Sequence, residues 1–496
     1  MLAPMWHGLE IGGAVRAGVS QRLRLLRETP ALWALAAITT LGALARLFFL
    51  FSYRPGLIGY PDTLAYLYSA KVNLFFDGIH PPGYAFFLRV LAEISPHLQL
   101  VTVVQHLFGL VGGLLLFDAL RRADVPRPVA LVPVAFLMLD GSELLLEHAV
   151  LSDALFLFLL QVALWCVVRS WRGSRWWAIA AGLSIGYASV VRIIGIELIP
   201  ILLLGFLLAP AQRKSWRVGT VLITVVCSAI VVASFEYAHH VADGTWGLAS
   251  TEDVNLYGRV SPWADCSKFK PPRGTADLCI RTPVADRYGP QWWEFTRGSP
   301  MVHAYPCCIG TKNENSRLKS FAIAAIESQP LTYLHYVARD LVRVVDPTFA
   351  SSPYPSVGNR GYGNTPTGLL KLELRQSQLA FELKTERALY GSAGLIAQNV
   401  GIIKAWDRDT RLEGPAMVAI LILALLAPLL ARDRPRRVAI LLLIVAAMLI
   451  VEPILGAEYD WRYMVPSFGL LVSAAAIGGW QVWRRAAMLS ARRRAR

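Results

Sequence analysis

The feature that most constrains this chain is a series of long apolar runs that carry no charge. Examples are Val218–Phe235, Gly414–Leu430 and Val438–Val451, in which apolar residues are contiguous and do not recur with the period of a half-buried helix or strand. Only 17% of the 496 residues are charged, against about a quarter in soluble domains. The mean hydropathy is +0.45. A soluble fold is therefore excluded, and these runs are expected to lie in lipid.

Apolar segments of this kind can be placed at ten positions, of which the third, fifth and sixth are short or interrupted. They are residues 31–51, 99–119, 128–141, 150–168, 176–192, 195–210, 218–238, 414–431, 438–456 and 467–483. Only helices and closed barrels satisfy every backbone group within a bilayer, and runs of this length fit helices. We therefore predict an all-α polytopic membrane protein with about ten transmembrane helices.

The basic residues fall in short clusters between these segments, and the formal net charge is +15. The clusters are Arg16/Arg22/Arg24/Arg27, Arg121/Arg122/Arg127, Arg169/Arg172/Arg175, Arg213/Lys214/Arg217, Arg432/Arg434/Arg436/Arg437 and the tail 484–496. If the first segment runs outward, every cluster falls on the inner side, as the positive-inside rule requires. This pattern excludes nucleic acid as a partner and predicts that both termini are cytoplasmic.

This topology divides the chain into five parts. They are a cytoplasmic segment 1–30, a transmembrane module 31–238 with a first outward loop 52–98, an exoplasmic domain 239–412, C-terminal transmembrane helices 413–483 and a basic cytoplasmic tail 484–496. The exoplasmic domain contains an amphipathic stretch, Leu318–Val345, whose apolar positions recur at helical spacing. We expect an α-containing domain inserted before the last three helices, with the chemistry in the outward parts.

Four of the six cysteines, Cys266, Cys279, Cys307 and Cys308, fall in this exoplasmic domain. Their position favours disulfides in an oxidising compartment over a metal site, because no paired histidine or two-residue cysteine spacing accompanies them. A Cys266–Cys279 bridge would stabilise the domain by about 3 kcal/mol in the chain-entropy model. Four cysteines allow three pairings, so the sequence leaves the connectivity open.

Two motifs lie in the first outward loop. Gly59-Tyr-Pro-Asp62-Thr-Leu-Ala-Tyr66 places a carboxylate just outside the first segment, and His80-Pro-Pro-Gly-Tyr84 follows it. Asp62 is a candidate base at the membrane surface. The alternative is that Asp62 caps the next helix, because Pro-Asp-Thr is a good helix start.

Three further motifs place ionisable residues at the outer ends of later segments. Glu147-His148-Ala-Val-Leu-Ser-Asp153 begins the fourth segment, Arg192 ends the fifth, and Asp460-Trp-Arg462-Tyr463-Met-Val-Pro466 precedes the last. Ionisable groups beside a membrane span are candidates for function. The alternative roles are structural: Arg192 can pair with Glu197 or extend to the interface, and Arg462 can anchor a helix end.

In their order and sidedness these motifs resemble the polytopic glycosyltransferase superfamily with the GT-C fold, particularly its protein mannosyltransferases and aminoarabinose transferases. That family carries an Asp in its first outward loop, and Arg462-Tyr463-Met-Val-Pro466 resembles its Arg-Tyr-x-x-Pro element. The stretch 255–262 is similar to bacterial, chiefly actinobacterial, phospholipid-carrier-dependent members. The resemblance covers most of residues 31–238 and 414–483.

The resemblance implies an inverting transferase that moves a hexosyl or pentosyl group from a polyprenyl-phosphate donor to a glycan, lipid or protein at the outer face of the bacterial cytoplasmic membrane. Because a phosphate is already a good leaving group, one base is enough, and Asp62 is the candidate. Arg192 and Arg462 are placed to bind the phosphate, since a guanidinium binds phosphate through two N–H groups.

The remaining candidates for donor or acceptor binding are His80, Glu147, His148, Asp153 and Tyr463. The carboxylates among them could instead hold a divalent cation such as Mg or Mn, and no other cofactor is expected. The function from another class that fits the same helix count is a transporter or lipid flippase for envelope precursors. Transporters place ionisable groups at mid-membrane in repeated halves, whereas these acids gather at outward ends. A non-catalytic envelope-assembly partner with the same fold is the third alternative.

Overall fold

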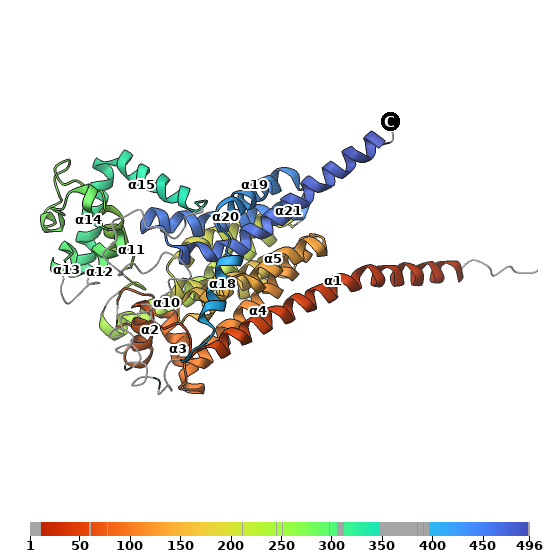
Figure 1. Ribbon diagram of the computed structural model, residues 1–496, viewed down its shortest axis with the longest axis horizontal. Coiled ribbons are helices and arrows are strands. Elements are labelled where there is room, and N and C mark those ends of the chain that lie inside the picture. Colours follow the sequence, from red (N-terminus) through yellow and green to blue (C-terminus); the bar gives the residue numbers. More distant parts are fainter. Residues whose placement is uncertain are drawn as a thin grey trace, which may run out of the picture.

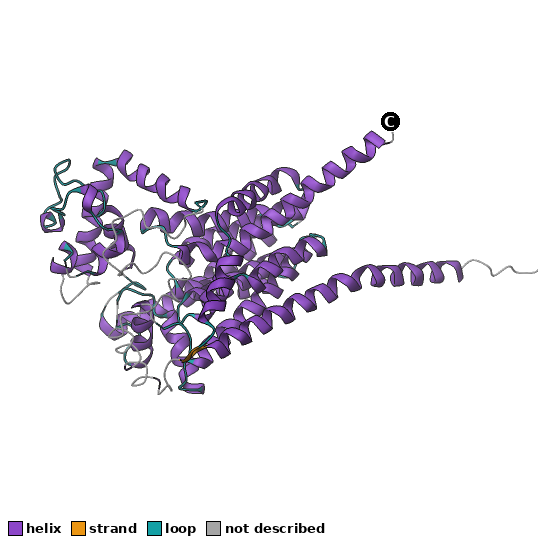
Figure 2. Ribbon diagram, viewed as in Figure 1, coloured by secondary structure: helices purple, strands orange, loops and turns teal. Residues whose placement is uncertain are grey.

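The protein is a helical bundle with a smaller helical domain at one end, as a computed structural model shows (Figures 1 and 2). The structure describes residues 11–58, 61–76, 78–210, 212–244, 246–249, 251–296, 298–304, 312–346, 384, 390 and 396–494. Within these residues the elements are almost all helices, which confirms the all-α prediction.

The N-terminal half of the bundle contains ten helices within the described residues. They are α1 (Ile11–Ser52), α2 (Pro61–Lys71), α3 (Gly83–Ile94), α4 (Gln99–Arg122), α5 (Arg127–Leu139), α6 (Gly141–His148), α7 (Asp153–Ser170), α8 (Trp176–Val191), α9 (Ile194–Leu207) and α10 (Lys214–Asp243). The C-terminal part adds α18 (Val400–Thr410), α19 (Gly414–Leu430), α20 (Asp433–Gly456) and α21 (Trp461–Arg494).

Each of the ten predicted apolar segments coincides with a helix: α1, α4, α5, α7, α8, α9, α10, α19, α20 and α21. Within the described residues, six of these helices are long and apolar enough to cross a membrane alone. Two pairs, α5 with α6 and α18 with α19, are bent by 50° and 44° and give up to eight spans if each pair is one span. The chain is therefore a multi-pass membrane protein, and the predicted count of about ten also needs the shorter apolar helices α8 and α9 to cross.

The smaller domain follows α10 and has its own apolar core. Its elements are α11 (Thr251–Val260), the 3-10 turns η1 (Ala276–Leu278) and η2 (Val284–Asp286), α12 (Pro290–Phe295), α13 (Pro300–Ala304), α14 (Lys312–Ser328) and α15 (Pro330–Arg343). Tyr257, Trp263 and Phe321 are almost fully buried in its core. The predicted amphipathic stretch 318–345 is two helices and not one, because α14 ends before Gln329 and Pro330 begins α15.

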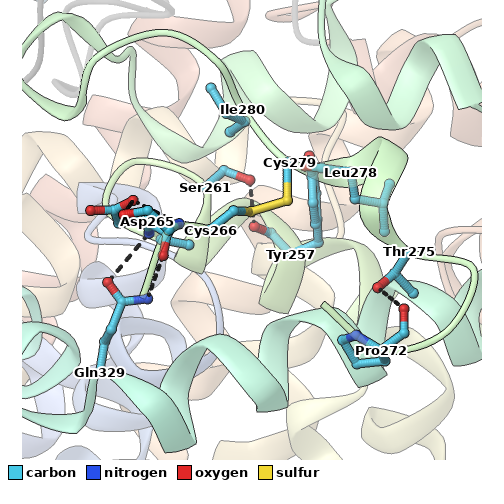
Figure 3. Close-up of a disulfide and its surroundings, with 12 residues drawn as sticks. Tyr257, Ser261, Asp265, Cys266, Pro272, Thr275, Leu278, Cys279, Ile280 and Gln329 are labelled. Atoms are coloured by element: carbon cyan, nitrogen blue, oxygen red, sulfur yellow. Dashed lines mark hydrogen bonds between the residues drawn. A yellow bond between two sulfur atoms is a disulfide. The ribbon is translucent and has the colours of Figure 1, made fainter. Parts of the chain in front are cut away.

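A disulfide joins Cys266 to Cys279 in this domain (Figure 3). Gln329 lies beside it and exchanges hydrogen bonds with the backbone of Asp265, at 3.3 Å and 3.4 Å. Of the three pairings that the sequence left open, the one containing Cys266–Cys279 is present. Cys307 and Cys308 lie outside the described residues.

The ends of the chain point away from this domain. The first turns of α1 and the last turns of α21 project from the opposite end of the bundle (Figure 1). Inside the bundle, α21 packs against α5, α19 and α20, and α8 packs against α7 and α10. A short antiparallel pair, β1 (Tyr53–Arg54) with β2 (Ile396–Ala397), joins the chain after α1 to the chain before α18.

Candidate active site

The segment between α1 and α3, which the sequence analysis places outward, is held against the chain between α6 and α7 by a row of hydrogen bonds. The backbone N–H of Leu57 donates to His148 O, and that of Val150 donates to Leu57 O, both at 3.0 Å. Further along, Thr63 Oγ1 donates to Val150 O at 3.0 Å. Tyr66 Oη donates to Ser152 Oγ at 3.1 Å. These contacts bring the start of α2 and the start of α7 together.

Arg462 lies between the carboxylates that begin those two helices. Its Nη1 is 2.8 Å from Asp62 Oδ2, and its Nε is 3.6 Å from Asp153 Oδ2. Arg462 stands in the first turn of α21, where its backbone N–H donates to Asp460 Oδ1 at 2.9 Å. The side chain is only 7% exposed, so its charge is balanced mainly by these acids.

Arg192 supplies a second positive charge to the same site. It follows the last residue of α8 and forms an ion pair with Asp153 Oδ1. The guanidinium groups of Arg192 and Arg462 both lie 5.2 Å from the centre of the Tyr463 ring. Asp153 is 1% exposed whereas Arg192 is 17% exposed, so Arg192 is the more accessible of the two partners.

His80 completes the surroundings of Asp62. Its Nε2 lies 3.7 Å from Asp62 Oδ1, and its ring is 4.9 Å from the ring of Tyr66. Burial opposes ionisation of Asp62, but the charges of Arg462 and His80 outweigh it and lower the pKa of this carboxyl. The lowered pKa makes Asp62 an ionised carboxylate. Its side chain is 22% exposed, so a second molecule can reach it.

Two acids that the sequence reasoning missed face this site. Glu294 on α12 is buried, and a Cβ atom placed on Gly258 would lie 1.8 Å from its Oε1, so a larger residue there would displace the Glu294 side chain. Burial, and then the negative charges of Glu458 and Asp62, raise the pKa of Glu294 well above its usual range. Glu458 lies between α20 and α21, and burial together with Asp460 and Asp340 raises its pKa to about 8. Neither acid belongs to a recognisable motif.

Glu147 and His148 belong to a different cluster, buried within the helical bundle. Glu147 Oε1 accepts a hydrogen bond from Arg46 Nη2 at 2.6 Å, and its Oε2 lies 2.9 Å from His106 Nδ1. His106 Nε2 lies 3.0 Å from His148 Nδ1. His148 Nε2 lies 2.7 Å from the carbonyl oxygen of Tyr53. All four side chains are at most 6% exposed, and the structure does not bring Glu147 or His148 into contact with Asp62.

The sequence contained one signal of this buried cluster. Arg46 and His106 are ionisable residues inside apolar segments. Ionisable residues in such segments usually pair with a specific partner. The partners could not be found from spacing, because they lie on different helices. The predicted site therefore separates into two clusters. One surrounds the partly exposed Asp62, His80 and Arg192, and the other, with Glu147 and His148, is buried within the bundle. Asp153, Arg462 and Tyr463 belong to the first cluster.

The predicted divalent cation has no clear position here. Among the described residues, no group of three or more His, Cys, Asp or Glu side chains could hold a metal ion. Asp62 and Asp153 are instead paired with arginines.

Part of the chain matches a known family. Residues 79–237 match the family described as dolichyl-phosphate-mannose-protein mannosyltransferase. The matched region is about a third of the chain, and it is similar to this family of mannosyltransferases. The matched region contains His80, Asp153 and Arg192, and it ends before the domain that holds the disulfide.

Two solved structures of an archaeal oligosaccharyltransferase from Archaeoglobus fulgidus are similar to the chain. One is AglB in complex with an inhibitory peptide and a dolichol-phosphate, with 12% identity, a TM-score of 0.46, and coverage of 95% of this chain and 52% of that one. The other is the apo form, with 14% identity, a TM-score of 0.45, and coverage of 94% and 52%. The chain thus spans about half the length of these proteins. The comparison with curated proteins gave no match.

Proposed function

We propose that this chain is a GT-C-type glycosyltransferase that moves one sugar, with inversion, from a polyprenyl-phosphate donor to a glycan, lipid or protein acceptor. The reaction takes place at the outer face of the bacterial cytoplasmic membrane, with both termini in the cytoplasm. One observation carries the proposal: Arg192 and Arg462 meet Asp62 and Asp153 at one site, next to the region that matches the mannosyltransferase family.

The two arginines are the donor side of the proposed site. When the bond between the anomeric carbon and the phosphate oxygen breaks, the electron pair leaves with the phosphate and its negative charge increases. Positively charged groups that are already in position stabilise such charge without reorganisation. Arg192 and Arg462 both lie 5.2 Å from the centre of the Tyr463 ring, and their planar guanidinium groups suit phosphate oxygens.

Asp62 is the acceptor side of the proposed site. As the acceptor oxygen bonds to the anomeric carbon, its proton passes to a carboxylate oxygen of Asp62, which leaves atoms and charge balanced. A positioned base of this kind contributes typically about 10²–10⁴-fold. The lowered pKa of Asp62 keeps it ionised at neutral pH, as a base must be.

The ion pair between Asp62 and Arg462 gives a reason why the donor would bind before Asp62 takes the acceptor proton. Arg462 lies 2.8 Å from Asp62, and its charge lowers the pKa of this carboxyl and so weakens its basicity. A phosphate near Arg462 would compete for the same N–H groups and raise the proton affinity of Asp62. Donor binding would therefore activate the base.

The test is transfer of radiolabelled sugar by the full chain, purified and reconstituted in lipid nanodiscs with a panel of polyprenyl-phosphate sugars. We expect transfer by the parent protein and a loss of about 10²-fold or more in Asp62→Asn. Asp277→Asn is the matched control, because Asp277 is an exposed acid of the smaller domain that pairs with Arg317.

Full activity in Asp62→Asn would remove this carboxylate from the mechanism. Binding of donors without turnover by the parent, across the whole panel, would instead favour the lipid flippase or an envelope-assembly partner.

A further inference from the structure

One face of α15 is apolar and exposed along the whole helix. Leu331, Leu334, Ala338, Leu341 and Val342 are exposed, at spacings of three, four, three and one residues, so they form one stripe along the helix. We call these five residues the α15 stripe. Leu331 is 81% exposed and Val342 is 64% exposed. Within this face His335 is the polar exception.

The opposite face of α15 already has partners in the protein. Asp340 Oδ2 lies 2.5 Å from Arg259 Nη1 of α11, and both side chains are almost fully buried. The guanidinium of Arg343 lies 4.6 Å from the centre of the Tyr459 ring. Val337, three residues before Asp340, is buried as well. The helix is therefore fixed in rotation, and the α15 stripe cannot turn inward without breaking a buried ion pair.

The position of α15 indicates what covers the stripe. Tyr333 Oη donates a hydrogen bond to the carbonyl oxygen of Leu455, in the last turn of α20, at 3.1 Å. α20 is a candidate membrane span, and the Leu455 side chain is 38% exposed. α15 lies beside the outer end of this helix, at the boundary between the smaller domain and the bundle (Figure 1). This contact places the helix that carries the stripe next to an exposed leucine at the end of a candidate membrane span.

From this geometry we propose that α15 is an interfacial helix whose stripe rests in the outer leaflet of the membrane that the chain spans. A helix with one apolar face and a polar opposite face is stable at the boundary between headgroups and acyl chains. His335 within this face would reach the headgroups. The anchor would set the height of the smaller domain, and of Glu294 within it, above Asp62.

The proposal does not depend on the proposed activity, and its test uses a chemical readout. The photoreactive amino acid p-benzoylphenylalanine is placed at Leu334 or Val342 in the full chain, which is reconstituted in nanodiscs of defined phospholipids and illuminated. Intact-mass spectrometry then measures the phospholipid adduct. Lys270, an exposed residue on a loop of the same domain, is the negative control, and Leu222, 58% exposed on the span α10, is the positive control.

We expect the fraction of chain with a lipid adduct at 334 and 342 to exceed that at 270 by about tenfold and to approach that at 222. Equal and low labelling at 334, 342 and 270 would overturn the proposal. So would crosslinking of 334 or 342 to a second copy of the chain, which would make the stripe a protein interface. Because the label replaces exposed residues, recovery of monodisperse protein for all four variants shows that folding is unchanged.

Discussion

Arg462 Nη1 lies 2.8 Å from Asp62 Oδ2, and the two residues come from opposite ends of the chain. Asp62 lies in the first turn of α2, which follows the first candidate span, and Arg462 lies in the first turn of α21, which contains the last. The pair therefore forms only when the N-terminal and C-terminal parts of the bundle have assembled. The site is a product of the complete fold, although the family match covers only residues 79–237.

Arg462→Lys is expected to lower sugar transfer by about 10²-fold or more, because a lysine ammonium cannot present the planar pair of N–H groups that a phosphate accepts. The fall should be in kcat and not only in the donor KM, since the charge on the phosphate increases in the transition state. Steady-state transfer rates across donor concentrations measure both constants. Arg281→Lys, on the exposed surface of the smaller domain, is the control. Unchanged kcat in Arg462→Lys would contradict this role.

Glu147→Ala tests whether Glu147 stabilises the buried cluster or binds the donor. Arg46 is 2% exposed and would lose its only carboxylate among the described ion pairs, so we expect a loss of stability of about 3–5 kcal/mol. Thermal unfolding in nanodiscs measures the loss, and Glu93→Ala, at an exposed position of α3, should show little change. The donor KM of the folded fraction should match that of the parent. A raised donor KM at unchanged stability would instead support the donor-binding role predicted from the sequence.

Much of the fold could be predicted because a helix that lies in lipid appears in the sequence as a contiguous apolar run. A run such as 218–238 is apolar on every face, and the helix α10 covers it. The short helices α8 and α9 were harder to bound, because length alone does not separate a span from a buried helix. Likewise, apolar spacing over 318–345 did not reveal that Pro330 starts a new helix.

The site was predictable only where a charged residue interrupts an apolar context. Asp62, Asp153, Arg192 and Arg462 stand at helix ends and could be identified individually. Their pairing depends on tertiary packing, which sequence spacing does not encode. Glu294 lies in a domain of ordinary polarity, where an acid carries no such signal, and its proximity to Glu458 required the structure.

Reduction of the Cys266–Cys279 disulfide should loosen the smaller domain and not the bundle. The bridge closes a loop with a sequence separation of 13, for which the chain-entropy model gives about 3 kcal/mol. The double variant Cys266→Ser/Cys279→Ser should be cleaved faster by protease within residues 251–346, while the bundle stays protected. Cys227→Ser, in the span α10, is the control. Equal cleavage rates in the parent and the double variant would show that the core around Trp263 holds the domain without the bridge.

Glu458→Gln should change how stability depends on pH. Burial, with the charges of Asp460 and Asp340, raises the pKa of Glu458 to about 8 in the folded protein, above the value of a free glutamate. Between about pH 4.5 and about pH 8, Glu458 holds a proton in the folded state that it has lost in the unfolded state. The free energy of unfolding therefore falls as the pH rises through this range. Glu458→Gln removes this titration, so its melting temperature should exceed that of the parent at pH 8.5, with the difference vanishing below pH 4.5. Thermal unfolding in nanodiscs at a series of pH values measures the difference, with Glu93→Gln as the exposed control. A difference that does not vary with pH would place the effect in side-chain packing and not in the protonation of Glu458.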